Sequence, residues 1–207
     1  MKKILSVLMV LSLMLLPMAA LAEADDYEVY IYEDESAGFA YPNDWLLISR
    51  EVIEEALEAG YTAGDGGMGD LVAALKPQME QMDMVMVMSP DTADNINVVR
   101  MDVGAETTDE QLLESAIQFQ QMMAAIDPEA EFASEPELTQ FAEGGRSFAV
   151  TMFSSTDTEG TPVMMIQALA AEGTMQYTFT LTLYSTDDTA LEIIEVMELV
   201  LGTFTTL

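Results

Sequence analysis

Three stretches in the C-terminal half of the chain alternate apolar with other residues and follow one another through short links. They cover residues 146–155, 163–171 and 175–184. In the last stretch Tyr177 and Phe179 point to one face, while threonines point to the other. The links contain glycine, and short glycine-bearing links between strands are typical of antiparallel hairpins. The pattern predicts an antiparallel meander, and other parts of the chain must cover its apolar face.

Two helices are predicted from their boundary signals. Thr108 and Gln111 form a capping box for a helix over residues 109–126, in which apolar residues recur at steps of three and four. Asp187 and Asp188 are expected to start a final helix, which Gly202 ends. These helices flank the predicted meander in the sequence, so they are candidates to cover it.

The remaining elements are shorter and are predicted from alternation or helical spacing. We expect a strand over 95–103 with a slip near Val99, and a weak strand over 132–141 interrupted by Pro136. Further strands are expected over 27–32, 38–41, 45–48 and 83–88, and further helices over 52–59 and over 71–82, where Pro77 introduces a kink or a break. The order of elements predicts an α+β fold, with a central antiparallel β-sheet sandwiched by helices.

The first 22 residues have the layout of a secretory signal peptide. Lys2 and Lys3 precede an apolar run, and Ala20 and Ala22 fit the small-residue cleavage site. The alternative, an uncleaved anchor, is disfavoured because the run is short for a bilayer, which needs about 20 apolar residues. We therefore expect cleavage after Ala22, a secreted or extracytoplasmic location, and a single domain over residues 23–207.

Charge is the dominant feature of the composition. Removal of the signal peptide leaves four basic residues, which are Arg50, Lys76, Arg100 and Arg146. Against them stand 37 Asp and Glu. Such a surface repels nucleic acid and anionic lipid headgroups, because both are bound through cationic side chains. It attracts Ca²⁺, basic proteins or cationic polymers, although acidity also serves solubility alone.

A glycine-rich segment at residues 64–70 has two interpretations. Four glycines within six residues form either a flexible surface loop or a backbone that binds Ca²⁺. Loop carboxylates that could supply weak Ca²⁺ ligands are Asp65, Asp70, Asp91 and Asp94. The segment lacks the residue spacing of an EF-hand, so we expect a surface loop and no cofactor beyond weak Ca²⁺ binding.

Methionines alternate through the strand predicted at 83–88. Met84, Met86 and Met88 share one face, and three thioethers in a row could bind Cu(I). The opposite face is also apolar, however, which is typical of a buried strand. We therefore expect these methionines to pack in the core.

Residues 38–45 (GFAYPNDW) combine a strand, a corner and an aromatic anchor. Phe39 and Tyr41 share a strand face beside the small Gly38, Pro42 ends the strand, and Trp45 opens the next apolar run. We expect the turn between Pro42 and Trp45 to bring the two short strands against each other, with the indole buried in the core.

This segment resembles the Gly-Phe-x-aromatic-Pro-x-x-Trp motif near the start of PsbP-like domains. Residues 95–99, the strand at 177–181 and the terminal helix are similar to later landmarks of that family. The resemblance implies a central antiparallel sheet sandwiched by helices, and a non-catalytic binding or assembly role like that of exported bacterial relatives. The photosynthetic role is not carried over, because plant-type members dock through basic surface residues and this chain has few.

Catalysis is the least supported class of function. The chain has no His and no Cys, which removes the commonest general base and the thiol nucleophile. We expect an exported, non-catalytic binding or assembly module of the cell envelope or extracellular space, with an envelope or extracellular protein or a cationic ligand as partner. The alternatives are an acidic Ca²⁺-binding secreted protein and, less favoured, a carboxylate-based hydrolase.

Overall fold

The computed structural model describes residues 26–60, 68–79, 81–90, 93–142, 145–156, 160–184 and 189–206. The predicted signal peptide lies outside these residues. The helices are α2 (Arg50–Glu58), α3 (Met68–Met79), α4 (Asp109–Ile126) and α5 (Thr189–Thr203). Within the described part of the chain, no helix combines the length and the hydropathy needed to cross a bilayer.

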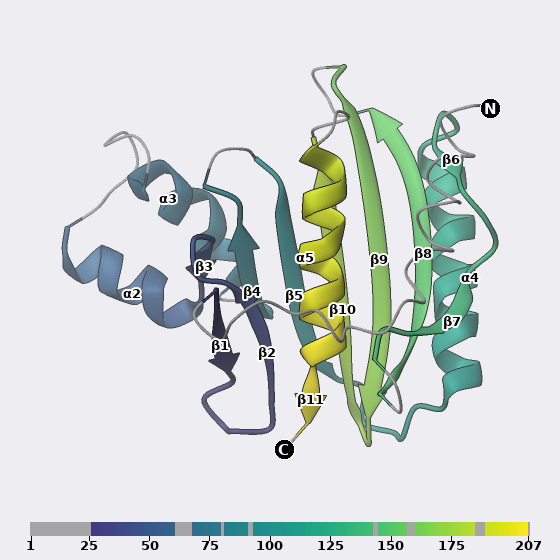
Figure 1. Cartoon of the computed structure of the whole chain (residues 1–207), viewed down its shortest axis with the longest axis horizontal. Helices are drawn as coiled ribbons and strands as arrows, with labels where there is room; N and C mark the ends of the chain where they lie inside the picture. The colour runs from purple at the N-terminus through teal and green to yellow at the C-terminus, as the bar shows by residue number, and fades with distance from the viewer. Residues whose placement is uncertain are drawn as a thin grey trace.

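An antiparallel sheet of eight strands forms the centre of the molecule (Figure 1). Its order is β3-β4-β5-β10-β9-β8-β6, and β7 also pairs with β8. The strands are β3 (Leu46–Ile48), β4 (Asp83–Met88), β5 (Asn95–Asp102), β6 (Glu131–Phe132), β7 (Glu137–Gln140), β8 (Ser147–Thr156), β9 (Pro162–Glu172) and β10 (Met175–Leu183). The predicted α+β fold is confirmed, and the meander corresponds to β8, β9 and β10.

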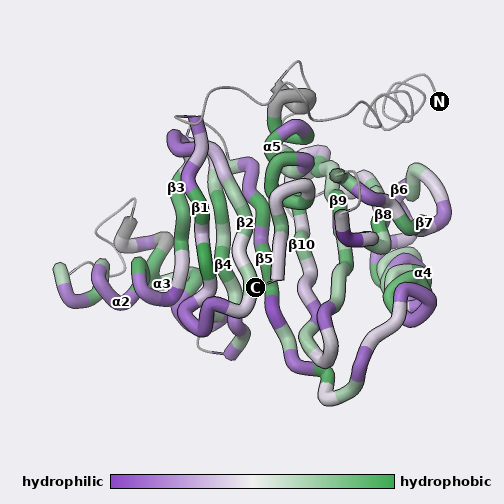
Figure 2. Tube along the Cα trace, turned by 60° about the horizontal axis from the view of Figure 1, so that its bottom comes forward, coloured by the Kyte–Doolittle hydropathy of each residue, from purple (hydrophilic) through white to green (hydrophobic). Residues whose placement is uncertain are grey.

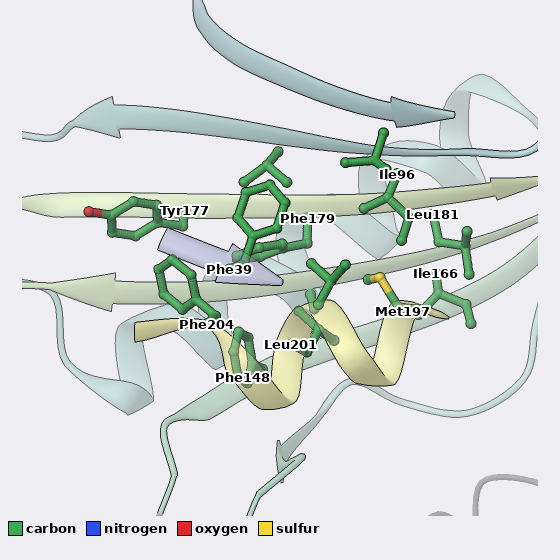
Figure 3. Close-up of a cluster of buried hydrophobic side chains, with 14 of the residues drawn as sticks. Phe39, Ile96, Phe148, Ile166, Tyr177, Phe179, Leu181, Met197, Leu201 and Phe204 are labelled. Atoms are coloured by element: carbon green, nitrogen blue, oxygen red, sulfur yellow. The ribbon is translucent and has the colours of Figure 1, made fainter. Parts of the chain in front are cut away.

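One face of this sheet packs against α5 and the N-terminal strand β2 (Ala37–Pro42). Figure 3 shows Phe204, which follows α5, among aromatic side chains of the sheet. The centroid of its ring lies 4.8 Å from that of Tyr177 and 5.0 Å from that of Phe179. Phe39 of β2 joins the same cluster. This layer is the main core, and it uses residues from both ends of the described chain.

The opposite face is covered by two separate groups of helices. Met84 of β4 is buried beneath α2 and α3, and Met86 and Met88 pack against the same cluster. At the other end of the sheet, α4 places Leu112 and Ala116 on β8 and β9. The three methionines therefore take part in core packing.

A second sheet, β1-β2-β11, lies over the β3-to-β5 end of the large one (Figure 1, Figure 2). It consists of β1 (Tyr27–Ile31), β2 and the short β11 (Thr205–Thr206). The expected pairing of the strands around Trp45 is wrong, because β2 belongs to this sheet whereas β3 pairs with β4. The strand β11 was not predicted, since two threonines carry no strand pattern of their own.

Several predicted boundaries also differ from the structure. The helix α5 continues through Gly202 to Thr203, and β5 pairs in continuous register through Val99 without a slip. The helix α3 runs through Pro77 but ends at Met79, so Met82 lies beyond it and is 42 % exposed. The weak strand at 132–141 is divided into β6 and β7, which both pair with β8.

The aromatic motif lies where the two sheets meet. Phe39 and Tyr41 are buried, and the Tyr41 hydroxyl donates to Glu28 Oε2 at 2.7 Å. Pro42 accepts a hydrogen bond from the backbone N–H of Trp45, and the half-buried indole packs against the main core. Gly38 pairs with Ile31 in β1.

Gly38→Ala should destabilise the protein, because an added Cβ would lie 2.7 Å from the Tyr30 carbonyl oxygen of the adjacent strand. Backbone on both sides must shift to relieve this contact, and overpacking of this kind typically costs about 1–3 kcal/mol. Urea unfolding followed by the fluorescence of Trp45, the one Trp of the chain, measures the change. An unchanged midpoint would show that the two strands separate easily.

Candidate functional site

A pocket of about 250 Å³ opens where the small sheet, the start of α2 and the β4–β5 end of the large sheet meet. Tyr30, Ile31, Tyr32 and Glu33 come from β1 and the residues after it. The other lining residues are Ser49, Arg50, Glu51, Asp83, Met84 and Arg100. The pocket thus combines tyrosine rings with charges of both signs.

Arg100 holds one wall of the pocket together. Its Nε donates to Asp83 Oδ2 at 2.6 Å, and its Nη1 donates to both carboxylate oxygens of Asp34, at 2.8 and 2.7 Å. Nη1 also donates to Ser36 Oγ, and the guanidinium carbon lies 4.4 Å from the centroid of the Tyr32 ring. One cation therefore ties the loop between β1 and β2 to the large sheet.

The positions of these groups follow from local structure. Asp83 begins β4 directly opposite Arg100 of β5, and a directly opposite pair is the closest contact between neighbouring strands. Ser49 caps the N-terminus of α2, where its Oγ accepts from the backbone N–H of Val52, so Glu51 lies in the first helical turn. A carboxylate is favoured there by the helix dipole.

The tyrosines experience both burial and negative charge. Burial, and after it the charges of Asp83 and Glu33, raises the pKa of Tyr30 to about 12. Burial also raises the pKa of Tyr32, which is 2 % exposed and whose hydroxyl has no hydrogen-bond partner among the described residues. Both phenols are therefore neutral at physiological pH, and Tyr32 retains an unused donor and acceptor.

The carboxylate of Asp34 and the guanidinium group of Arg100 stabilise each other's charge. Hydrogen bonds from Ser36 and then from Arg100 lower the pKa of Asp34 to about 2. Burial acts to lower the pKa of Arg100, but its hydrogen bonds to Asp34 and Asp83 raise it above the usual value. The pair of Asp34 and Arg100 thus stays ionised across the physiological range.

The strand β1 forms an open edge beside the pocket. It pairs with β2 alone among the described strands. Hydrogen bonds join the backbones at its two ends, from Asn43 N to Asp26 O and from Tyr32 N to Ala37 O. In an antiparallel pair the hydrogen-bonded positions alternate, so the backbone N–H and C=O groups of the even-numbered residues of β1 point to β2. The backbone groups of Val29 and Ile31 therefore face outward, and their side chains are 60 % and 49 % exposed.

Of the four carboxylates predicted as weak Ca²⁺ ligands, Asp70 and Asp94 lie among the described residues, in different parts of the fold. Asp65 and Asp91 lie outside the described part of the chain. Asp70 is exposed in the first turn of α3, whereas Asp94 is fully buried and accepts from the backbone N–H of Tyr184 at 2.6 Å. No group of three or more acidic side chains suited to a metal ion occurs within the described residues.

Arg100 was not singled out by the sequence, although its environment contained one signal. With so few cations among 37 acids, each basic residue is expected to be in contact with carboxylates. Arg146 follows the same rule, since its Nη2 contacts Glu172 Oε2 at 2.5 Å and Thr206 Oγ1 at 2.8 Å. Which acids surround each arginine depends on the fold.

Asp34→Asn should lower stability at neutral pH by about 0.2–1 kcal/mol, the usual range for a partly exposed ion pair. Because the folded-state pKa of Asp34 lies below its ordinary value of 3.8, its contribution is present above that value and lost as the pH falls toward about 2. The difference between wild type and variant should therefore shrink between about pH 4 and pH 2.

Urea unfolding across this pH range measures the effect. The control is Asp44→Asn, which removes an exposed carboxylate of the turn before β3 and corrects for the general benefit of removing one negative charge. A stability difference that persists unchanged at pH 2 would contradict the prediction.

Comparison with known proteins identifies the fold. No protein-family model and no curated protein matches the sequence. The solution structure of the cyanobacterial PsbP protein CyanoP from Synechocystis sp. PCC 6803 matches with a TM-score of 0.55 and 13 % identity, over 93 % of this chain and 99 % of CyanoP.

Two further solved structures are similar at lower coverage or lower score. A crystal structure from Bacteroides thetaiotaomicron matches with a TM-score of 0.50 and 13 % identity, over 88 % of this chain but only about half, 49 %, of that protein. LpqN of Mycobacterium tuberculosis, which is involved in cell envelope biogenesis, matches with a TM-score of 0.40 and 11 % identity over 87 % of this chain and 90 % of its own. The similarity to CyanoP shows that the chain has a PsbP-like fold, as the aromatic motif predicted.

Proposed function

We propose that this chain is an exported, non-catalytic binding module of the cell envelope or extracellular space, and that it binds an extended segment of a partner protein. The binding surface is the open edge of β1 together with the adjoining pocket. Export is supported by the signal-peptide layout of residues 1–22, and a non-catalytic role by the absence of His and Cys from the chain.

The observation that carries this proposal is the open edge of β1. Its outward-facing N–H and C=O groups lack a strand to pair with among the described elements, and two apolar side chains beside them are exposed. An edge of this kind is a template for another strand, and proteins usually protect it with charge, proline or a covering element. An added strand would pair with the backbone and cover Val29 and Ile31.

Val29→Pro should abolish binding of extended peptides. The N–H of Val29 faces the open edge, so proline removes a donor to the partner without removing a hydrogen bond to β2. A displayed library of random short peptides supplies the ligands, and enrichment on the wild type is compared with enrichment on the variant. The wild type is expected to enrich peptides that pair with the β1 edge in an extended conformation, and the variant is expected to enrich none.

Charge substitution provides a second variant with a matched control. Val29→Lys combined with Ile31→Lys should also abolish enrichment, because it places two charges on the edge. The control, Met122→Lys with Ile126→Lys on α4, alters two residues that are 51 % and 70 % exposed and far from β1 in the sequence. Equal enrichment on all variants, or none on the wild type, would refute the proposed function.

A further inference from the structure

We propose that the pocket beside β1 receives a basic side chain, lysine or arginine, from the segment bound at the β1 edge. This inference rests on the proposed function and names the chemistry that the site recognises. The pocket, at about 250 Å³, is smaller than the roughly 300–1,000 Å³ sites that hold drug-sized ligands. Its size suits a single side chain.

The charges of the pocket favour a cation. Three carboxylates line it, those of Glu33, Glu51 and Asp83, against the guanidinium groups of Arg50 and Arg100. Arg100 is already bound by Asp34 and Asp83, which form ion pairs with it.

Arg50 donates through Nη2 to the Met79 carbonyl oxygen at 2.9 Å. Glu33 and Glu51 are exposed, and neither forms an ion pair within the described part of the chain. Two accessible carboxylates are therefore left to bind an incoming positive charge.

The tyrosines add a second means of holding a cation. The Tyr32 ring already carries the Arg100 guanidinium on one face, so aromatic stacking with a cation is in use in this wall. Tyr32 itself is only 2 % exposed, so the half-buried ring of Tyr30, which also lines the pocket, is the aromatic surface left for an incoming cation.

The pocket and the edge share residues, which connects the two parts of the site. Ile31 is exposed on the open edge of β1 and also lines the pocket, between Tyr30 and Tyr32. A strand paired with β1 would therefore pass the mouth of the pocket. An anionic side chain at that point would be repelled by Glu33 and Glu51, whose two negative charges exceed the single positive charge of Arg50.

The test uses a lysine analogue and its neutral counterpart. N-acetyl-lysine-N-methylamide and N-acetyl-norleucine-N-methylamide are titrated separately into protein labelled at its methyl groups, and the Ile31 and Met84 methyl signals are followed by NMR. The lysine compound should give saturable shifts that weaken with added salt, and the norleucine compound should give none. The arginine analogue should behave as the lysine compound does.

Glu33→Gln combined with Glu51→Gln should weaken lysine binding about tenfold, which is the effect of losing a charge-assisted hydrogen bond. The matched control is Glu54→Gln with Glu55→Gln, which makes the same change of net charge at exposed positions of α2 outside the pocket. It should leave the affinity within about twofold of wild type, because exposed charges beyond the site are screened.

The outcomes separate this inference from the proposed function. Absence of shifts with lysine, equal shifts with norleucine, or equal weakening by both double variants would overturn the inference. If library peptides still bind and still depend on Val29, the proposed function stands, although the pocket does not distinguish a cationic side chain from a neutral one. If enrichment is insensitive to Val29→Pro, the proposed function fails whatever the lysine titration gives.

Discussion

Both faces of the large sheet carry apolar side chains, and the rest of the structure depends on keeping both from water. The helix α5 and strand β2 cover one face, whereas α2, α3 and α4 cover the ends of the other. Burial of apolar area is the largest favourable term in folding, so these contacts decide where every other element lies. Arg100 and Arg146 act at the margins of this arrangement. Arg100 binds the loop after β1, and Arg146 binds the strand β11.

The elements that could be predicted from the sequence are those with local causes. The capping box of Thr108 and Gln111 is present as expected, because it needs only residues of one helical turn. The meander strands were predictable from alternation. By contrast, the separation of β2 and β3 into different sheets is decided by distant partners, and Gly202 stays helical because α5 is held on the sheet as far as Thr203.

The candidate site lay beyond prediction for the same reason. Asp34, Asp83 and Arg100 are distant in the sequence, and their contact depends on the register of β4 with β5 and on the loop after β1. The scarcity of cations favours contacts between arginines and acids, as Arg100 and Arg146 show, but it does not specify which acids. The PsbP-like fold, shared with CyanoP at 13 % identity, fixes the scaffold and leaves the function to side chains such as these.

The position of β2 between β1 and β11 has a consequence for the order of folding. Its backbone N–H at Ala40 is bound by the hydroxyl of Thr203, 163 residues later in the chain. Contacts of such large separation form slowly, because the intervening chain must first be ordered. A chain that grows from its N-terminus therefore carries the apolar side chains of Phe39 and Tyr41 uncovered until its last helix is available to pack on them.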